Sequence, residues 1–197
     1  MDTYRTLSAP SSARYTVKMS RFLAFAYPVA SEEEAKALIR KVANDYHDAR
    51  HVCWAYMLGH DRSRYQSSDN GEPSGTAGKP ILGQVNSLEL TDVLVLVVRY
   101  FGGIKLGTGG LIDAYRTAAR MALDEAPVEE RHAQATLQVA CPYVSLNTVM
   151  GAIKALGLRI LAQDFDNTCV LTLSVRLDHV AEATRRLSAA ATVTRLS

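Results

Sequence analysis

The chain has 197 residues, 48% of them hydrophobic and 21% charged, with a formal net charge of +2. This composition is typical of a folded globular protein, and the charge is too small to indicate a nucleic-acid binder by itself. No stretch reaches the roughly 20 apolar residues of a membrane span and no signal-peptide core is seen, so we expect a cytoplasmic protein without a membrane partner. The charge is uneven, because residues 131–197 carry seven Lys or Arg against four Asp or Glu.

The first part of the chain combines short apolar runs with one amphipathic helix. After a loose lead-in over residues 1–14, we expect strands over residues 15–17 and 21–27. Ser31, with Glu34 three positions later, forms a capping box. The helix that it starts carries apolar residues at three- and four-residue spacing, so one face of this helix should be buried.

The middle of the chain contains a long polar stretch between two apolar strands. A short aromatic strand is expected over residues 52–58. Residues 60–80 offer almost nothing to bury, so we expect a loop of the length that is usually functional or disordered. A short helix should open near Gly75. The Val and Leu run over residues 93–98 ends at Arg99 and is typical of a strand buried on both faces.

A glycine-rich turn follows, and then a helix over about residues 111–126 that Pro127 ends. The charged run after it predicts a boundary between domains over residues 15–130 and 131–197. The second domain should contain helices and strands in the order βαββαβ, over residues 134–140, 145–156, 159–165, 169–176, 179–190 and 192–196. This order is the ferredoxin-like plan.

The glycine-rich turn is the first segment that could carry chemistry. Glycine fills five of the nine positions of GGIKLGTGG, namely Gly102, Gly103, Gly107, Gly109 and Gly110. Glycine lets main-chain N–H groups approach a ligand, and the positive end of the next helix points to the same place. An anion is therefore expected there, with Lys105 and Arg99 as further donors. A strained turn that needs glycine for geometry alone is the alternative, and neither the Walker nor the dinucleotide glycine motif is matched.

The polar segment SSDNGEPSGTAGKP, residues 67–80, concentrates acidic and hydroxyl side chains. Its carboxylates, Asp69 and Glu72, are candidates for acid–base chemistry or metal binding. They are equally candidates for holding the basic residues of the glycine turn in place. Ser74 and Thr76 lie near the start of a helix, where small hydroxyls commonly act as caps.

Histidine and cysteine give weaker signals. His47 and His51 stand four residues apart, but no HExxH glutamate accompanies them, and a helix exit suits a protonated imidazole. Cys53 lies in an expected strand and is interpreted as a buried thiol. Cys141 and Cys169 are distant in sequence, so neither a disulfide framework nor a zinc knuckle is indicated. We expect no bound metal and no cofactor.

Aromatic residues flank both polar segments. Rings there could stack nucleic-acid bases while neighbouring Arg and Lys hold phosphates. The rings are those of Trp54, Tyr56, Tyr65, Tyr100, Phe101 and Tyr115, and packing in the core is the alternative explanation for half or more of them. Tyr65 stands alone in a polar loop and is the best candidate for an exposed ring.

Four long blocks, in order, resemble the IMPACT/YigZ family. They are SRFLAFAYPV, ARHVCWAY, SDNGEPSGTAGKPIL and VVRYFGGIKLGTGGLIDAY, and the resemblance covers roughly residues 15–127. It implies an α+β fold with an N-terminal domain similar to domain 2 of ribosomal protein S5. A ferredoxin-like domain similar to the last domain of elongation factor G should follow.

The resemblance also implies a function. Both of those fold relatives meet RNA or the ribosome, and eukaryotic family members are linked to translational control through binding a regulator of an initiation-factor kinase. The resemblance therefore implies a translation-associated regulatory or binding protein. Its partner would be RNA, the ribosome or a regulatory protein. One departure concerns Asp113, which stands where the family usually has a basic residue, so the rim of the site loses a positive group.

Two main hypotheses therefore stand side by side, with a pure protein-docking module as a third. The leading one is a non-enzymatic, anion-accepting surface made of Tyr65, Asp69, Glu72, Ser74, Thr76, Lys79, Arg99, Tyr100, Gly102, Gly103, Lys105, Gly107, Thr108, Gly109, Gly110 and Tyr115. The alternative is a small hydrolase of a phosphorylated or peptide substrate, with catalytic candidates Asp69, Glu72, His51 and Lys79.

Overall fold

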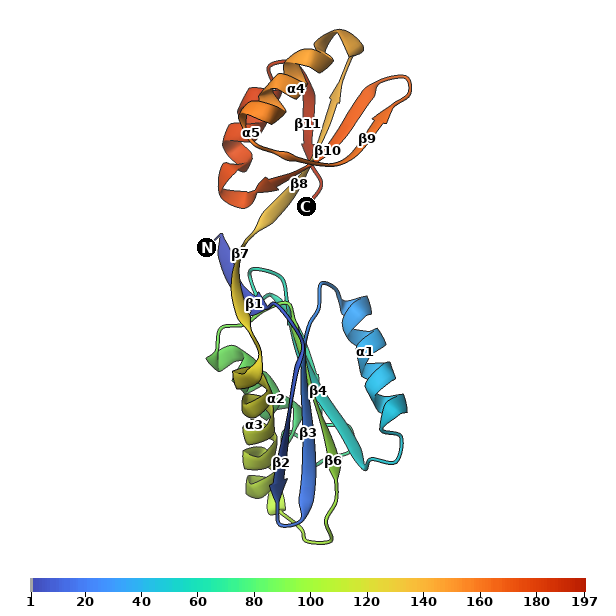
Figure 1. Cartoon of the computed structure of the whole chain (residues 1–197), viewed down its shortest axis with the longest axis vertical. Coiled ribbons are helices and arrows are strands. Elements are labelled where there is room, and N and C mark those ends of the chain that lie inside the picture. Colours follow the sequence, from blue (N-terminus) through green and yellow to red (C-terminus); the bar gives the residue numbers. More distant parts are fainter. Residues whose placement is uncertain (1) are drawn as a thin grey trace. The chain divides into compact units, whose positions relative to one another are not determined.

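The computed structural model describes residues 2–197, and its contacts divide the chain into two compact units, Thr3–Arg131 and His132–Ser197. Both units combine antiparallel sheets with helices (Figure 1). The expected α+β class is confirmed. No helix within the described residues is both long and apolar enough to cross a bilayer.

The N-terminal unit is built on a five-stranded sheet in the order β2-β3-β6-β4-β5. Its strands are β2 Ser11–Val17, β3 Ser20–Pro28, β4 His51–Leu58, β5 Arg64–Ser68 and β6 Val93–Tyr100. Helix α1, Glu32–Asp45, covers one face, and α2, Gly78–Ser87, and α3, Gly107–Glu125, cover the other (Figure 1). A ribbon of β1, Thr3–Leu7, and β7, Val128–His132, completes the elements of this part.

Strand β6 is the centre of this sheet. Its residues from Val93 to Val98 are fully buried, because alternate side chains enter two different cores. Val95 and Val97 pack under α2 and α3, whereas Leu94 and Leu96 pack under α1. The prediction of a strand buried on both faces is confirmed.

The predicted helix start at Ser31 is also confirmed. The Ser31 hydroxyl accepts a hydrogen bond from the Glu34 N–H, and the Glu34 carboxylate accepts one from the Ala30 N–H. The Glu34 N–H, which the helix N-terminus leaves unpaired, is thereby satisfied by the cap, and the reciprocal bond goes to the N–H one residue before the cap.

Two local predictions were wrong. Residues 1–14 are not a loose lead-in, because β1 and most of β2 lie there. The stretch 60–80 is not all loop, since β5 pairs with β4 along it. β2 and β5 are the edge strands of the five-stranded sheet. The side chains of β5 are polar and mostly exposed, and β2 begins with two serines, so hydrophobic periodicity gives little signal at these positions.

The C-terminal unit follows the predicted ferredoxin-like plan. Its elements in chain order are β8 Gln134–Cys141, α4 Leu146–Ala155, β9 Arg159–Phe165, β10 Cys169–Arg176, α5 Val180–Leu187 and β11 Thr192–Arg195. The sheet order β11-β8-β10-β9 corresponds to 4-1-3-2, with all neighbours antiparallel. Val149, Ile153 and Leu187 of the helices pack on one face of this sheet, so the alternation of apolar residues predicted this unit correctly.

Candidate functional site

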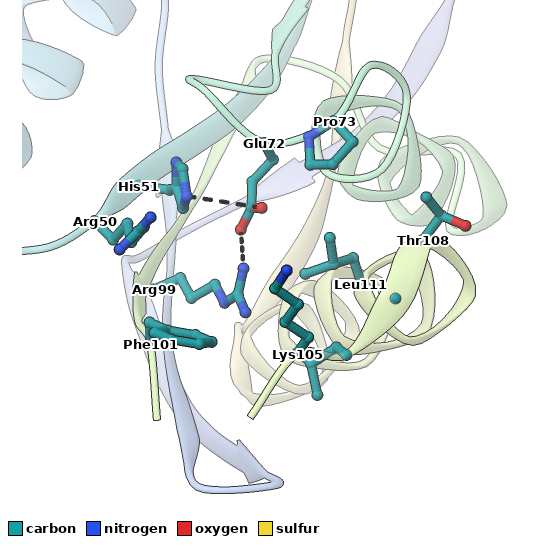
Figure 2. A pocket seen from close by; sticks show the side chains of 11 residues that line it. Arg50, His51, Glu72, Pro73, Arg99, Phe101, Lys105, Thr108 and Leu111 are labelled. Carbon is teal, nitrogen blue, oxygen red and sulfur yellow. Dashed lines mark hydrogen bonds and ion pairs between the residues drawn. The ribbon is translucent and has the colours of Figure 1, made fainter. Parts of the chain in front are cut away.

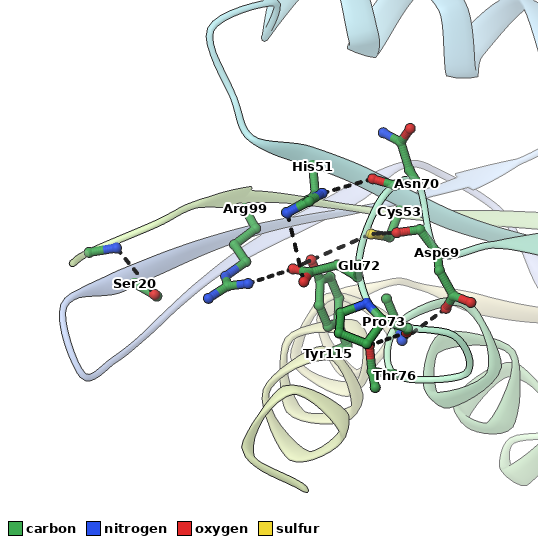
Figure 3. Close-up of polar contacts among 12 residues, drawn as sticks. Ser20, His51, Cys53, Asp69, Asn70, Glu72, Pro73, Thr76, Arg99 and Tyr115 are labelled. Atoms are coloured by element: carbon green, nitrogen blue, oxygen red, sulfur yellow. Dashed lines mark hydrogen bonds and ion pairs between the residues drawn. The ribbon is translucent and has the colours of Figure 1, made fainter. Parts of the chain in front are cut away.

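Asp69 organises the loop between β5 and α2. Its carboxylate accepts hydrogen bonds from three main-chain N–H groups, those of Gly75 (2.8 Å), Ala77 (3.1 Å) and Gly78 (2.8 Å). Figure 3 shows Asp69 in this loop. Burial disfavours its charged form, but the three donors outweigh burial, and the pKa of Asp69 is lowered from its usual value. This carboxylate therefore shapes the loop and caps the start of α2.

Glu72 lies within that loop and is almost fully buried, with its side chain 3% exposed. Its Oε1 atom accepts hydrogen bonds from Arg99 Nη1 at 2.7 Å and from the Tyr115 hydroxyl at 2.7 Å. His51 Nε2 lies 3.7 Å from Oε2, and its Nδ1 lies 2.8 Å from the Asn70 carbonyl oxygen (Figure 3). Glu72 thus ties together three elements, namely β4, β6 and α3.

Strand register explains why these residues meet. His51 of β4 is paired with Arg99 of β6, and the Arg50 N–H donates to the Arg99 carbonyl. Gly71, with φ +86°, brings the loop so close to His51 that a Cβ atom would lie 3.2 Å from the imidazole. Residues distant in sequence are therefore held at one end of the sheet.

A pocket of about 430 Å³ opens above this cluster. It is lined by Arg50, His51, Glu72, Pro73, Arg99, Phe101, Lys105, Leu106, Gly107, Thr108 and Leu111 (Figure 2). Three of its lining residues are Arg or Lys and only one is a carboxylate, which is already paired with Arg99. The pocket therefore carries excess positive charge beside an apolar wall.

The N-terminus of α3 faces the same pocket through Gly107 and Thr108. The residue before the helix, Leu106, makes no side-chain cap, and the first turn holds no acidic residue. The first N–H groups of a helix lack partners within it and carry partial positive charge, so an uncapped terminus favours an anion.

Two guanidinium groups and an aromatic ring form the opposite wall. The Arg50 and Arg99 guanidinium carbons each lie 5.6 Å from the centre of the Phe101 ring, which is 42% exposed. Arg99 is 5% exposed, and its Nε atom has no hydrogen-bond partner within residues 2–197. The two guanidinium groups can bind an anionic group, and the exposed Phe101 ring can stack against a flat one.

The two segments singled out in the sequence contribute to one pocket. Of the candidates, the structure brings His51, Glu72, Arg99, Lys105, Gly107 and Thr108 to its lining. Tyr115 lies beneath it, fully buried and bonded to Glu72.

The other candidates lie outside the pocket lining. Asp69 and Thr76 support the loop, because Asp69 holds its main chain and the Thr76 hydroxyl donates to the Pro73 carbonyl. Tyr100 donates to Asp48, and Tyr65 is 62% exposed on β5. The remaining ones, none of them in the lining, are Ser74, Lys79, Gly102, Gly103, Gly109 and Gly110.

Gly102 has a structural reason of its own. A Cβ atom there would lie 2.1 Å from the Met19 carbonyl carbon, so only glycine allows the chain after β6 to pass the β2–β3 turn. A Cβ at Gly109 would meet nothing within 4 Å. Geometry therefore accounts for glycine at Gly102 but not at Gly109.

Sequence reasoning considered Phe101 only as one of the aromatic rings that flank the loops, and it missed Arg50, Pro73, Leu106 and Leu111 as lining residues. Arg50 directly precedes a residue that was singled out, but no spacing rule marks it. Strand register, which sets Arg50 beside Arg99, is the signal that would have found Arg50.

Cys53 is buried, as expected from the sequence. Burial raises the pKa of Cys53 to about 12, and its thiol donates to the Asp69 carbonyl oxygen at 3.0 Å. Cys53 is therefore a protonated core thiol at neutral pH. Within residues 2–197, no group of three or more His, Cys, Asp or Glu side chains is arranged to hold a metal ion.

Comparison with known proteins decides the family. The Impact N-terminal domain model matches residues 18–123, and the Escherichia coli protein "IMPACT family member YigZ" is 32% identical over 95% of this chain and 93% of its own length. The chain belongs to the IMPACT family.

Two further comparisons extend over most or all of the chain. A Thermus thermophilus "IMPACT family member in pol 5'region" is 42% identical over 71% of this chain and 74% of its own. A solved structure titled "Crystal structure of an hypothetical protein" is 30% identical and superimposes with a TM-score of 0.81, covering 100% of this chain and 98% of that one. The fold of that solved structure is therefore shared over the whole length of this chain.

Proposed function

We propose that this IMPACT protein is a non-enzymatic, translation-associated binding protein and that its pocket accepts a phosphate group of RNA. The observation that carries the proposal is the uncapped N-terminus of α3, which opens onto Arg50, Arg99 and Lys105. The pocket is lined by the first residues of this helix and by three cationic side chains. Its one carboxylate, Glu72, is already paired with Arg99, so the site favours an anion.

The state of the acids supports binding rather than hydrolysis. A general acid or base needs a proton site that is free to reach a substrate. Asp69 is occupied by three main-chain donors, and one oxygen of Glu72 accepts from both Arg99 and Tyr115. Lys79, the remaining acidic-loop candidate, does not line the pocket. The hydrolase hypothesis has no comparable support.

Phe101 supports RNA as the source of the phosphate. Its ring is partly exposed in the pocket lining, and the Arg50 and Arg99 guanidinium carbons each lie 5.6 Å from its centre. Single-stranded RNA is commonly held by phosphate contacts together with base stacking on such rings. The translational part of the proposal comes from the family, whose eukaryotic members are linked to translational control.

The test is binding of a fluorescently labelled single-stranded RNA, followed by anisotropy at several salt concentrations. Arg50→Ala with Lys105→Ala should weaken binding and lower the slope of log K against log salt by about one for each phosphate that the protein no longer neutralises. Arg40→Ala with Lys41→Ala is the matched control, because it removes the same charge from exposed positions on α1. Binding that is independent of salt, or equally affected by both pairs, would exclude the proposal.

A further inference from the structure

Two cysteines that are 28 positions apart face each other in the C-terminal unit. Cys141 is the last residue of β8 and Cys169 is the first residue of β10, and the antiparallel register pairs them directly. Both thiols are free and at most 1% exposed, and both belong to the core under α4 and α5. The sequence alone separates them, whereas the sheet brings them together.

Opposite residues of antiparallel strands form either hydrogen-bonded or non-hydrogen-bonded pairs, and the backbone hydrogen bonds of β8 show which type Cys141 and Cys169 form. The Thr136 N–H donates to the Ser197 carbonyl, and the Leu196 N–H donates to the Thr136 carbonyl, so Thr136 directs its backbone groups toward the β11 side. Successive residues of a strand direct these groups to opposite sides, so Cys141 directs its own toward β10. The Leu177 N–H donates to the Ala133 carbonyl and continues the β8–β10 ladder. Ala133 is an even number of residues from Cys141, so this bond supports the same direction for Cys141.

Cys141 and Cys169 therefore form a hydrogen-bonded pair, for which the Cα atoms lie about 5.5 Å apart. Disulfide bonds need Cα atoms about 4.4–6.8 Å apart with side chains on the same side. Paired residues of neighbouring strands project their side chains to the same face. The Cα separation of such a pair lies within the disulfide range, and a small approach of the two strand ends would bring the Cβ atoms, about 5.5 Å apart in a hydrogen-bonded pair, to the roughly 4 Å that the bond needs.

We propose that Cys141 and Cys169 are an oxidisable dithiol that forms a reversible disulfide within the chain. With a hydroperoxide as oxidant, one thiolate attacks a peroxide oxygen and becomes a sulfenic acid, releasing water or alcohol. The second sulfur attacks that sulfenic sulfur and releases water. Two thiols lose two protons and two electrons, and one peroxide bond is reduced.

Access to the pair runs through the end of the sheet. Tyr143 lies two residues after Cys141, and its hydroxyl donates to the Phe165 carbonyl and lies 3.1 Å from the Asp166 carbonyl oxygen. Those carbonyls belong to the turn that leads into Cys169. Tyr143 is 51% exposed, so one surface contact fastens the segments on both sides of the cysteine pair.

The third cysteine provides an internal control. Cys53 belongs to the N-terminal unit, where its thiol is within hydrogen-bonding distance of Asp69 and Tyr115 and its pKa is raised to about 12 by burial. Burial, with the neighbouring Cys169 thiol, also raises the pKa of Cys141. Because the thiolate is the reactive form, oxidation of the pair should accelerate as pH rises.

The experiment treats the reduced full-length chain with hydrogen peroxide, unfolds it in an alkylating reagent and maps the peptides by mass spectrometry. We expect one alkylated thiol in place of three, a peptide that joins Cys141 to Cys169, and full reversal by a dithiol reductant. Cys53→Ala should leave this bond intact, and Cys141→Ala should abolish it. Three alkylated thiols in the treated wild type, or a bond that involves Cys53 or a second chain, would overturn the proposal.

A second variant tests the access route and does not depend on either cysteine being replaced. Tyr143→Phe removes the hydroxyl that fastens the sheet end, so we expect disulfide formation to become several times faster. Tyr65→Phe removes an exposed hydroxyl from the N-terminal unit and should leave the rate unchanged. Equal rates in the two variants would exclude Tyr143 as the barrier to oxidation.

Discussion

The acidic loop, residues 67–80, and the glycine segment, residues 102–110, share a pocket but use their polar groups in opposite ways. The loop turns its carboxylates inward, where Asp69 binds main-chain N–H groups and Glu72 binds Arg99. The glycine segment leads into a helix whose first turn has no side-chain cap. Acidic residues near a pocket can therefore build it, while the binding capacity lies in donors that the fold leaves open.

The largest expected effect follows from removing the central carboxylate. Glu72→Ala would leave the Arg99 guanidinium buried without its partner, which typically costs about 3–5 kcal/mol. Denaturant unfolding of wild type and variant measures the change. Glu125→Ala removes an exposed glutamate of α3 and should change the free energy of unfolding by less than about 0.5 kcal/mol. Similar losses in the two variants would mean that Glu72 does not hold the pocket together.

A smaller effect is expected when the loop loses its organising charge. Asp69→Asn keeps one acceptor oxygen but places an amide where main-chain donors point, so we expect a loss of about 1–3 kcal/mol in the free energy of unfolding. The affinity for single-stranded RNA in the anisotropy assay should fall as well, because the loop carries Glu72 and Pro73 into the pocket.

The pH dependence of that loss has a definite sign. The pKa of Asp69 is lower in the folded chain than in the unfolded one, so its carboxylate stabilises the fold above the unfolded pKa, near 3.9. This stabilisation disappears as pH falls through the pKa of the folded chain, because Asp69 is then protonated in both the folded and the unfolded chain. The difference in the free energy of unfolding between wild type and Asp69→Asn should be constant above about pH 5 and should narrow in acid. A gap that is unchanged in acid would show that the charge of Asp69 is not what organises the loop.

Periodicity predicted much of the fold because burial repeats along regular elements. The amphipathic helix after Ser31, the doubly buried run of β6 and the whole C-terminal unit follow from it. The edge strand β5 was not predicted, since its exposed polar side chains carry no such repeat, and only the last three residues of β2 were predicted.

The site was predicted less completely, for a different reason. Its segments could be identified as polar and rich in glycine, but the contacts of Asp69 depend on the path of a loop. Arg50 beside Arg99, and Cys141 opposite Cys169, depend on strand register. A one-residue shift in register would turn those side chains to the other face, and nothing in local spacing specifies that choice.

The smallest expected effect concerns Asp113, the one acidic residue in the first two turns of α3. Its side chain is 76% exposed and lies 3.3 Å from Arg116, so replacing it should change the free energy of unfolding by less than about 0.5 kcal/mol. Asp113→Arg supplies the basic residue that the family usually has there and should strengthen RNA binding several-fold at low salt, an advantage that screening removes at high salt. Asp124→Arg makes the same charge change at the far end of α3 and is the matched control. Equal gains in the two variants would reveal a general charge effect, whereas a gain confined to Asp113→Arg means that the bound phosphates follow the N-terminal end of α3.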